Sequence, residues 1–235
     1  MAYAFVLVHG AWHGGWCWQR VADRLRGGGH TVFTPTLTGL GERSHLLRAG
    51  IDLKTHVVDV VNVMKWEDLS DIVLCGHSYG GMVISGVAEA LPQAIRSIVF
   101  LDAFVPRNGE AVQDLTGPAV REAAQAAMQR GDIVIPQRPA EAFGVNPADR
   151  AWVDRLCVGQ PLGTFTDKIA LTGARDRIAR RSYIRAKSYA NPGFDRALGE
   201  VRSDPSWRSY EVPSGHDVMV DMPERLTEIL LEVAQ

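Results

Sequence analysis

The stretch Asp71–Glu89, DIVLCGHSYGGMVISGVAE, constrains the fold of this chain more than any other. It begins with an apolar run, Ile72–Cys75, which is long enough for one buried strand, and continues into a glycine-rich turn at residues 76–81. After the turn, apolar residues recur with the spacing of a helix face, at Ile84, Val87, Ala88 and Leu91. A strand, a G-x-S-x-G turn and a helix in this order form a nucleophile elbow.

Ser78 occupies the centre of that turn. Gly76 and Gly80 flank it because side chains at these positions would collide with a strained apex that exposes the serine hydroxyl. The following helix directs its N-terminal N–H groups and the positive end of its dipole at the same point, where an oxyanion would form. The pattern therefore predicts that Ser78 is a catalytic nucleophile and not an ordinary turn residue.

Composition excludes several classes of protein. The chain has 235 residues, 46% of them hydrophobic, and a net charge of −2, so it is long enough for one large core and has no basic field for nucleic acid or anionic membrane. Its three cysteines show no C-x-x-C spacing, which favours free thiols in a reducing compartment. The apolar run Phe5–Val8 is too short for a signal peptide or a membrane span. We expect a cytoplasmic protein without nucleic-acid or membrane partners.

Strand-like and helix-like patterns alternate along most of the chain. Strands are expected at residues 5–8, 31–37, 72–75, 97–105, 182–186 and 207–212. Asp52 is the expected N-cap of a helix, and the chain should end in a helix at 223–233. Because the expected strands up to residue 105 are apolar on both faces and alternate with helices, they predict an α/β fold whose mostly parallel sheet is covered by helices on both sides.

Residues 106–179 interrupt this alternation. Pro118 opens an alanine-rich helix that extends to Arg130, and Asn146 followed by Pro147 predicts the start of another helix. We expect this segment to be a helical cap that lies over Ser78. The cap would be inserted between two parts of one core, residues 1–105 and 180–235.

A serine hydroxyl needs a base to remove its proton, and that base needs an orienting acid. In this type of sheet the order along the chain is Ser…Asp/Glu…His. His216 follows the last expected strand and precedes the C-terminal helix, which is the position required of the base. The oxyanion hole needs the N–H of the residue after the nucleophile, Tyr79, and one N–H from the loop after the first strand, for which we expect Ala11.

His9 and His13 have the H-x-x-x-H spacing that can bind zinc on a helix. They lie in a glycine-rich turn with no third ligand nearby, so we predict no metal site.

Four segments together resemble one branch of the α/β-hydrolase superfamily, which contains plant methyl-salicylate-type esterases, hydroxynitrile lyases and related bacterial carboxylesterases. The segments are FVLVHGAWHGGWCW, GHSYGG, VFLDAFVP and SGHDVM. The resemblance implies an α/β-hydrolase core with a six-stranded sheet, lacking the first two strands of the full fold. It also implies a catalytic triad that uses no metal or organic cofactor.

The acid of the triad is where the chain departs from this branch. The branch usually places an aspartate where this sequence has Tyr189. Two acids could replace it: Asp195, whose ordinary role would be that of a helix-start acid, and Asp102, which ends the strand after the elbow helix. Haloalkane dehalogenases, which resemble this core, place a triad acid at that strand end. A carboxylate there is costly to bury without a partner, and a histidine N–H would supply one. We favour Asp102 over Asp195.

The motifs predict a serine carboxylesterase that hydrolyses small to medium apolar or aromatic esters through an acyl-enzyme. Hydroxynitrile lyases of the branch carry a threonine in the first-strand loop and a lysine after the catalytic histidine, where this chain has Gly10 and Asp217. The cation proposed to stabilise cyanide is therefore missing, which favours ester hydrolysis over lyase-like C–C cleavage. Lyase-like cleavage stays an alternative, as does a weakly catalytic receptor for a small ligand.

Aromatic residues are expected to line an apolar pocket beneath the cap, as ligand pockets generally require. The candidates are Trp12, Phe104, Trp152 and Phe165. By contrast, Arg181, Arg185 and Lys187 are interpreted as solvated surface charges. The expected partner is a small-molecule ester, and the sequence is compatible with a homodimer.

Overall fold

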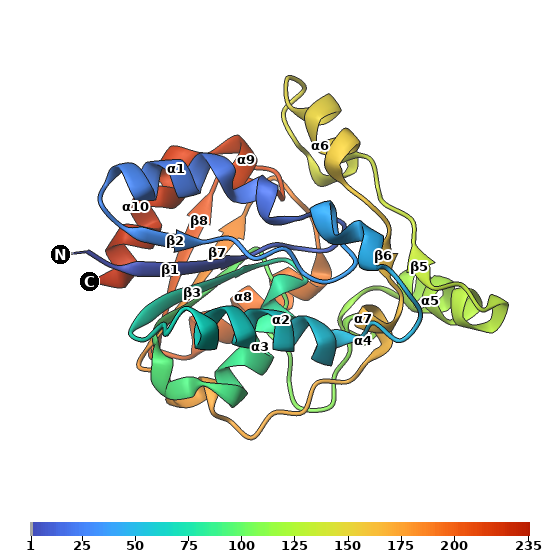
Figure 1. Cartoon of the computed structure of the whole chain (residues 1–235), viewed down its shortest axis with the longest axis horizontal. Helices are drawn as coiled ribbons and strands as arrows, with labels where there is room; N and C mark the ends of the chain where they lie inside the picture. Colours follow the sequence, from blue (N-terminus) through green and yellow to red (C-terminus); the bar gives the residue numbers. More distant parts are fainter. Residues whose placement is uncertain (1) are drawn as a thin grey trace.

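A computed structural model of the chain describes residues 2–235. Its centre is a six-stranded sheet with the strand order β2-β1-β3-β4-β7-β8, and every neighbouring pair of strands is parallel (Figure 1). The strands are β1 (Ala4–Val8), β2 (Thr31–Phe33), β3 (Ile72–His77), β4 (Ile95–Leu101), β7 (Arg180–Ala186) and β8 (Trp207–Val212). The predicted six-stranded parallel sheet is confirmed.

Helices cover both faces of this sheet (Figure 1). One face carries α1 (Gln19–Gly27) and α10 (Pro223–Ala234), and the other carries α2 (Leu53–Trp66), α3 (Gly80–Ala90) and α8 (Pro192–Ser203). A short helix, α9 (Val218–Asp221), precedes α10. A separate hydrophobic core fills the space between the sheet and each helical layer.

The first strand, β1, is apolar along its whole length because it lies between two hydrophobic cores. Phe5 and Leu7 belong to the core shared with α1 and α10. Val6 and Val8 belong to the core shared with α2 and α3. Successive side chains of a strand point to opposite faces, so an unbroken apolar run is what a strand between two cores needs.

Two of the predicted strands are shorter than expected. β2 ends at Phe33 instead of Leu37, and β4 ends at Leu101 instead of Val105. The backbone of Asp102 has a φ of +41°, which takes the chain out of the sheet. Phe104 then donates its N–H to the carbonyl oxygen of Ser78 at 3.2 Å, and not to a neighbouring strand. The residues left over from these apolar runs form loops at the carboxyl edge of the sheet.

The segment between β4 and β7 carries four α-helices and two short strands. They are α4 (Val112–Leu115), α5 (Pro118–Arg130), β5 (Val134–Ile135), α6 (Arg150–Leu156), β6 (Gln160–Pro161) and α7 (Gly163–Thr166). β5 and β6 form an antiparallel pair of their own. This segment lies beyond the carboxyl ends of the sheet strands, with α5 furthest from the core (Figure 1). Its helix at 118–130 has the predicted bounds.

The predicted start of the next helix at Asn146 and Pro147 is wrong. α6 begins at Arg150, three residues after Pro147. The side-chain oxygen of Asn146 accepts hydrogen bonds from the N–H groups of Ala148 (3.1 Å) and Asp149 (3.2 Å). Asn146 therefore closes a separate Asx turn, because its side chain can imitate a backbone carbonyl in a turn as well as in a cap.

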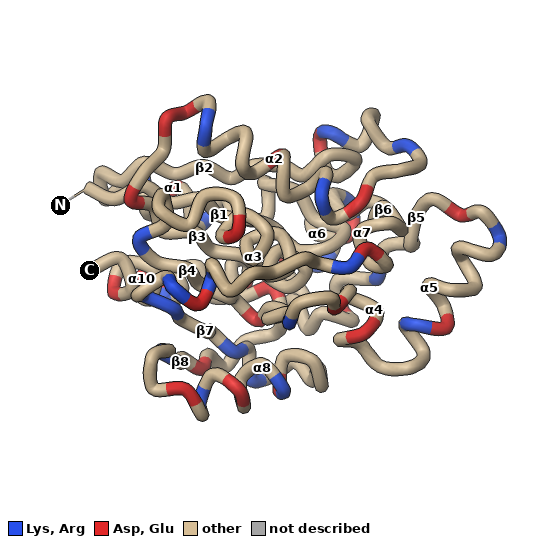
Figure 2. Tube along the Cα trace, turned by 90° about the horizontal axis from the view of Figure 1, so that it is seen from below, with Lys and Arg blue, Asp and Glu red and all other residues tan. Residues whose placement is uncertain are grey.

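Charged residues of both signs are interspersed along the chain, and in the view of Figure 2 the Lys and Arg segments lie among the Asp and Glu segments. In the described part of the chain, residues 2–235, no helix has both the length and the apolar character needed to cross a bilayer.

Asp52 caps α2 as predicted: its Oδ1 accepts the N–H of Thr55 at 2.8 Å. Replacing it by alanine (Asp52→Ala) should lower the free energy of unfolding by about 1 kcal/mol, because an N–H of the first turn loses its acceptor. Asp52→Asn keeps an acceptor oxygen and should lose much less. Urea unfolding of the three proteins measures both values, and equal losses in the two variants would contradict a capping role.

Candidate active site

Ser78 lies at the apex of the turn between β3 and α3, with a φ of +54°. A residue other than glycine in this region is strained and persists only where its surroundings hold it. The Ser78 N–H donates to the Leu101 carbonyl oxygen at 3.1 Å, and its own carbonyl oxygen accepts the N–H of Gly81 at 3.0 Å. Hydrogen bonds to β4 and α3 thus fix the serine in the conformation that the sequence motif predicts.

The flanking glycines are required by close approach of the backbone. A Cβ atom on Gly76 would lie 2.6 Å from the carbonyl oxygen of Gly80. One on Gly80 would lie 2.8 Å from the carbonyl oxygen of Val8. Both distances are shorter than van der Waals contact, so the turn cannot be this tight with larger residues at either position.

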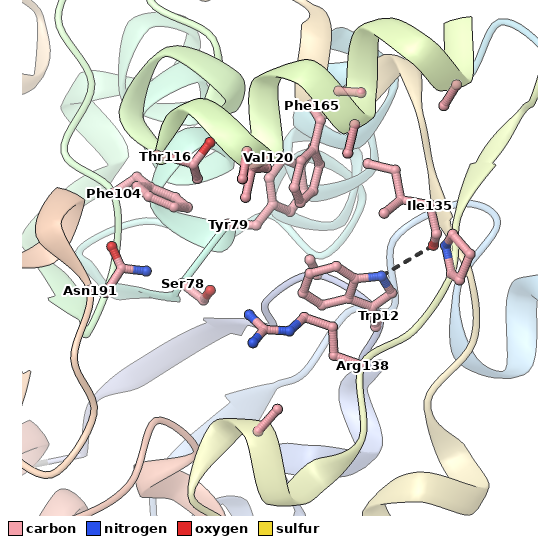
Figure 3. A pocket seen from close by; sticks show the side chains of 18 of the residues that line it. Trp12, Ser78, Tyr79, Phe104, Thr116, Val120, Ile135, Arg138, Phe165 and Asn191 are labelled. Carbon is pink, nitrogen blue, oxygen red and sulfur yellow. Dashed lines mark hydrogen bonds between the residues drawn. The ribbon is translucent and has the colours of Figure 1, made fainter.

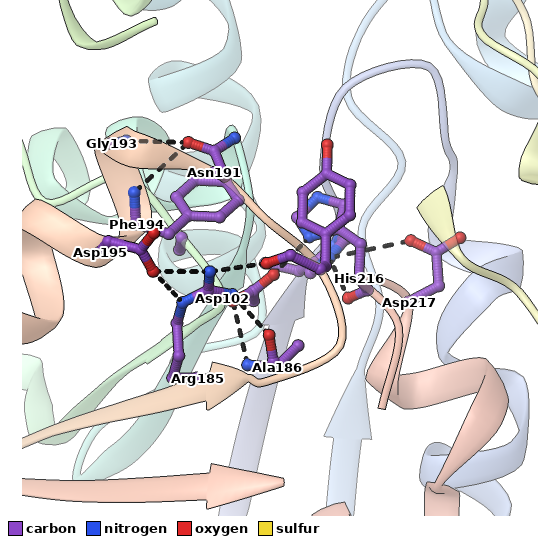
Figure 4. Close-up of polar contacts among 12 residues, drawn as sticks. Asp102, Arg185, Ala186, Asn191, Gly193, Phe194, Asp195, His216 and Asp217 are labelled. Atoms are coloured by element: carbon purple, nitrogen blue, oxygen red, sulfur yellow. Dashed lines mark hydrogen bonds and ion pairs between the residues drawn. The ribbon is translucent and has the colours of Figure 1, made fainter. Parts of the chain in front are cut away.

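His216 and Asp102 are in direct contact. His216 Nδ1 lies 2.6 Å from Asp102 Oδ2, and both side chains are buried (Figure 4). Because a carboxylate can only accept, Nδ1 carries the hydrogen and Nε2 is left as an acceptor. This is the tautomer that a general base needs in order to take a proton from a serine. Asp195 makes no such contact; its side chain is 62% exposed.

The second oxygen of Asp102 is bound by the neighbouring strand. Oδ1 accepts Arg185 Nη1 at 2.6 Å and the N–H of Ala186 at 3.0 Å. Nη2 of the same guanidinium donates to Asp195 Oδ1 at 2.8 Å, so Arg185 bridges the two candidate acids (Figure 4). Burial disfavours the charged form of Arg185, but the two carboxylates outweigh this effect and raise its pKa.

The interpretation of Arg185 as a surface charge is wrong, because only 4% of this residue is exposed. Arg181 is also buried, where it bonds to the Asp176 carbonyl and to Ser206. Lys187 is exposed, as expected. The burial of both arginines could have been inferred from their place in the chain, because both lie in β7, an inner strand of the sheet.

The two amides predicted for the oxyanion hole have no partner within the described chain. Ala11 and Tyr79 line the same cavity as Ser78, and the N–H of neither donates to an acceptor in residues 2–235. The adjacent N–H of Trp12 is already bound to Gln160 Oε1 at 2.9 Å. Ala11 is therefore better placed than Trp12 to donate a free N–H from this loop.

Ser78, Tyr79 and His216 line a cavity of about 1260 Å³. Figure 3 shows Ser78 and Tyr79 in its wall. The expected lining residues Trp12, Phe104 and Phe165 are all part of its wall. Trp152, also predicted to line the pocket, lies elsewhere: its ring packs against Trp16 with 5.1 Å between ring centroids. That prediction is wrong because α6 buries this aromatic face against the loop that precedes α1.

Comparison with known proteins identifies the family. The model of the alpha/beta hydrolase family matches residues 5–229. The chain belongs to the alpha/beta hydrolase family. The α/β-hydrolase fold expected from the sequence is thereby confirmed.

Several relatives of this hydrolase are named as esterases. It is 43% identical to the carbendazim hydrolyzing esterase of Nocardioides sp. (strain SG-4G), over 96% of this chain and 97% of the relative. It is 25% identical to methylesterase 7 of Arabidopsis thaliana, over 98% and 95% of the two chains.

Among solved structures, an extracellular alpha/beta-hydrolase from a Paenibacillus species has a TM-score of 0.86 and 25% identity, covering 98% of both chains. That protein is described as sharing structural and functional homology with tobacco salicylic acid binding protein 2. The relatives support ester cleavage as the reaction of this enzyme.

Tyr189, which stands where the family resemblance led us to expect an aspartate, packs against His216, the predicted base. Its ring stacks on the His216 imidazole with 4.5 Å between centroids and 24° between planes. Phe194 stacks on His216 at 5.3 Å and 17°. These contacts restrict the orientation of the His216 imidazole ring. From the sequence alone, Tyr189 could be recognised only as a departure from the residue expected at its position.

A second cluster of buried polar residues, His13, His77 and Asp217, lies next to His216. Asp217 Oδ2 contacts His13 Nε2 at 3.1 Å, and His77 Nε2 lies 3.0 Å from the His216 carbonyl oxygen. Burial opposes ionisation of Asp217, but the charge of His13 outweighs it and lowers the Asp217 pKa to about 2. His77, His216 and Asp217 form the one three-residue group within 2–235 whose ligand atoms are close enough to suggest a metal. His77 Nε2 carries the hydrogen bonded to the His216 carbonyl, so only Nδ1 of this ring keeps a lone pair, and that atom has no hydrogen-bond partner within residues 2–235.

His9, in the loop after β1, is bonded as a neutral imidazole. Its Nδ1–H donates to the Gly10 carbonyl oxygen at 2.8 Å, while Nε2 accepts the Leu37 N–H at 3.1 Å. Burial lowers the pKa of His9 from 6.5 to about 3. Between these two pH values the unfolded chain binds a proton at His9 that the folded chain does not bind, so stability falls as the pH falls.

This His9 linkage should amount to about 3 kcal/mol between pH 7 and pH 4. Unfolding of His9→Gln should therefore depend less steeply on pH over that range, although the variant is less stable at pH 7. His45→Gln, a change at an exposed histidine, serves as the control and should keep the wild-type slope. Identical slopes for wild type and His9→Gln would contradict a buried neutral His9.

Proposed function

We propose that this hydrolase is a serine carboxylesterase for small to medium esters with apolar or aromatic parts. Ser78 is the nucleophile, His216 the general base and Asp102 the acid that orients it. The observation that carries the proposal is the 2.6 Å contact between His216 and Asp102 beside the cavity that contains Ser78. The esterase names of the relatives support the same reaction class.

In the first step, Ser78 Oγ attacks the ester carbonyl carbon while His216 Nε2 accepts the hydroxyl proton. The carbonyl oxygen becomes an oxyanion, which accepts hydrogen bonds from the free N–H groups of Ala11 and Tyr79. Asp102 holds Nδ1–H and stabilises the imidazolium. Collapse of the tetrahedral intermediate transfers the proton to the leaving alcohol and leaves an acyl group on Ser78.

In the second step, a water molecule attacks the acyl carbonyl carbon, and His216 takes one of its protons. The same two amides hold the second oxyanion. When the intermediate collapses, the carboxylic acid leaves and His216 returns the proton to Ser78 Oγ. The cycle consumes one water and releases one alcohol and one acid, with no cofactor.

The surroundings of Asp217 favour ester hydrolysis over the lyase alternative. Asp217 is fully buried and bonded to His13. The Asp217 carboxylate therefore occupies the position at which lyases of this branch carry a lysine. Receptor function is the other alternative. It gains no support from a site in which the N–H groups of Ala11 and Tyr79 are free to donate hydrogen bonds and His216 Nε2 is free to accept a proton.

The segment between β4 and β7 is proposed to act as the cap of this site. Trp12, next to Ala11 in the oxyanion loop, donates its ring Nε1–H to the Ile135 carbonyl oxygen at 3.2 Å (Figure 3). Its backbone carbonyl oxygen accepts the N–H of Val158 at 2.9 Å. These bonds tie the cap to the core at the edge of the pocket.

Hydrolysis of 4-nitrophenyl acetate and butyrate tests this function. Ser78→Ala should lower kcat by a factor of about 10⁴, and Asp102→Asn by about 10³ to 10⁴, because the imidazole loses its orientation. Asp195→Asn is the matched control, since Asp195 bonds the same guanidinium but not His216; it should stay within about threefold of wild type.

Each alternative gives a different result. Near-full activity of Asp102→Asn would overturn the assignment of the acid. Turnover that does not depend on Ser78 would overturn the serine mechanism, and release of cyanide from mandelonitrile would identify a lyase. An ester panel that varies acyl and alcohol size then defines the preferred substrate.

A further inference from the structure

Arg138, which follows β5 in the cap, points its side chain into the cavity that contains Ser78 (Figure 3). Its guanidinium carbon lies 5.6 Å from the centroid of the Phe143 ring. Within the described residues, no carboxylate oxygen lies within 4.0 Å of its nitrogen atoms. The other arginine of the cavity wall, Arg130, forms an ion pair with Asp132 at 2.7 Å. Arg138 is thus a solvent-exposed cation of the pocket wall that has no carboxylate partner within residues 2–235.

Two more polar side chains face the same part of the cavity. One is Tyr189. Burial raises the pKa of its phenol, and the positive charge of Arg138 opposes this rise. The Oδ1 atom of Asn191 caps α8 by accepting the Gly193 N–H at 2.9 Å, and its amide nitrogen points toward the cavity (Figure 3). Arg138, Tyr189 and Asn191 therefore form a group of hydrogen-bond donors, which we call the donor cluster.

Most of the side chains in the adjoining wall are apolar. Its residues come from α5 and β5 and include Val120, Ala123, Ala124, Ala127 and Ile135. A guanidinium binds a carboxylate through two parallel hydrogen bonds, and such charge-assisted pairs are stronger where water is displaced. A few polar groups in a mostly apolar pocket are what fix the orientation of a ligand. The chemistry that complements this wall is an aromatic ring that carries a carboxylate.

We propose that Arg138 is a specificity-determining residue that binds a carboxylate on the substrate, and that the preferred substrates are half-esters of aromatic dicarboxylic acids. The inference rests on the proposed function, because it assumes that the ester group of the same molecule lies at Ser78. Tyr189 and Phe143 set the spacing. Tyr189 stacks on His216 at 4.5 Å, and the Phe143 ring lies 5.9 Å from the His216 ring and 5.6 Å from the Arg138 guanidinium carbon. An aromatic ring between ester and carboxylate would span from the nucleophile to the donor cluster.

The test compares two esters that differ in charge and little in size, methyl 4-carboxybenzoate and methyl 4-methylbenzoate. Wild type should prefer the carboxylate ester in kcat/KM. Arg138→Met should lower kcat/KM for that ester at least about tenfold, mainly through KM, since the loss is one charge-assisted pair. The neutral ester should change less than about twofold because it makes no such pair. Arg130→Met is the matched control, because Arg130 already has Asp132 as its partner, and it should preserve the preference.

Binding separates this inference from the proposed function. Methyl 4-carboxybenzoate should bind to Ser78→Ala at least about tenfold more tightly than to Ser78→Ala/Arg138→Met in calorimetric titrations, whether or not any ester is cleaved. If wild type hydrolyses neither ester but this difference is present, the proposed function fails and the carboxylate site stands. If both esters are cleaved, but Arg138→Met changes neither their ratio nor the affinity, the carboxylate site is wrong and the esterase stands.

Discussion

The contact between His216 and Asp102 is the interaction on which the rest of the site depends. A carboxylate that is fully buried is costly unless each of its oxygens has donors. Asp102 obtains one donor from His216, after β8, and two from Arg185 and Ala186 in β7. Since β4, β7 and β8 are adjacent in the sheet, their carboxyl ends bring these groups to one place. The sheet order thus both stabilises the carboxylate and positions the base.

The cap contributes to the same geometry. The N–H of His216 donates to the carbonyl oxygen of Phe143 at 2.8 Å, so a cap residue fixes the loop that carries the base. A Cβ atom on Gly215 would lie 2.3 Å from the Gly144 carbonyl oxygen, which shows how closely the two loops approach. On the other side of the pocket, Trp12 ties the oxyanion loop to β5 and β6. The segment between β4 and β7 therefore holds in place both loops that the proposed mechanism uses.

Much of the core and the central part of the site could be predicted because local patterns determine them. The turn around Ser78 depends on Gly76 and Gly80 within five residues, and β8 has the predicted bounds because Pro213 directly follows its last residue, Val212. Asp102 could be favoured over Asp195 because a charge that ends a buried strand needs a nearby donor. These arguments use only short segments and the order of the elements.

The failures depend on contacts between distant segments. Arg185 is buried because Asp102, far from it in sequence, supplies the opposite charge. Trp152 faces Trp16 because of how α6 docks, which its own sequence does not specify. Arg138 has no local motif, and its place in the cavity wall follows only from the path of the cap. Contacts between segments that are distant in sequence decide which polar side chains are buried. A single sequence does not reveal these contacts.

The most direct measurement of the central claim is covalent labelling with a fluorophosphonate, followed by peptide mass spectrometry. If His216 and Asp102 activate the hydroxyl at the elbow, the enzyme should take up one phosphonyl group, on Ser78. Labelling of His216→Ala should be slower by at least about a hundredfold. Labelling at another residue, or an equal rate in the His216 variant, would contradict the account.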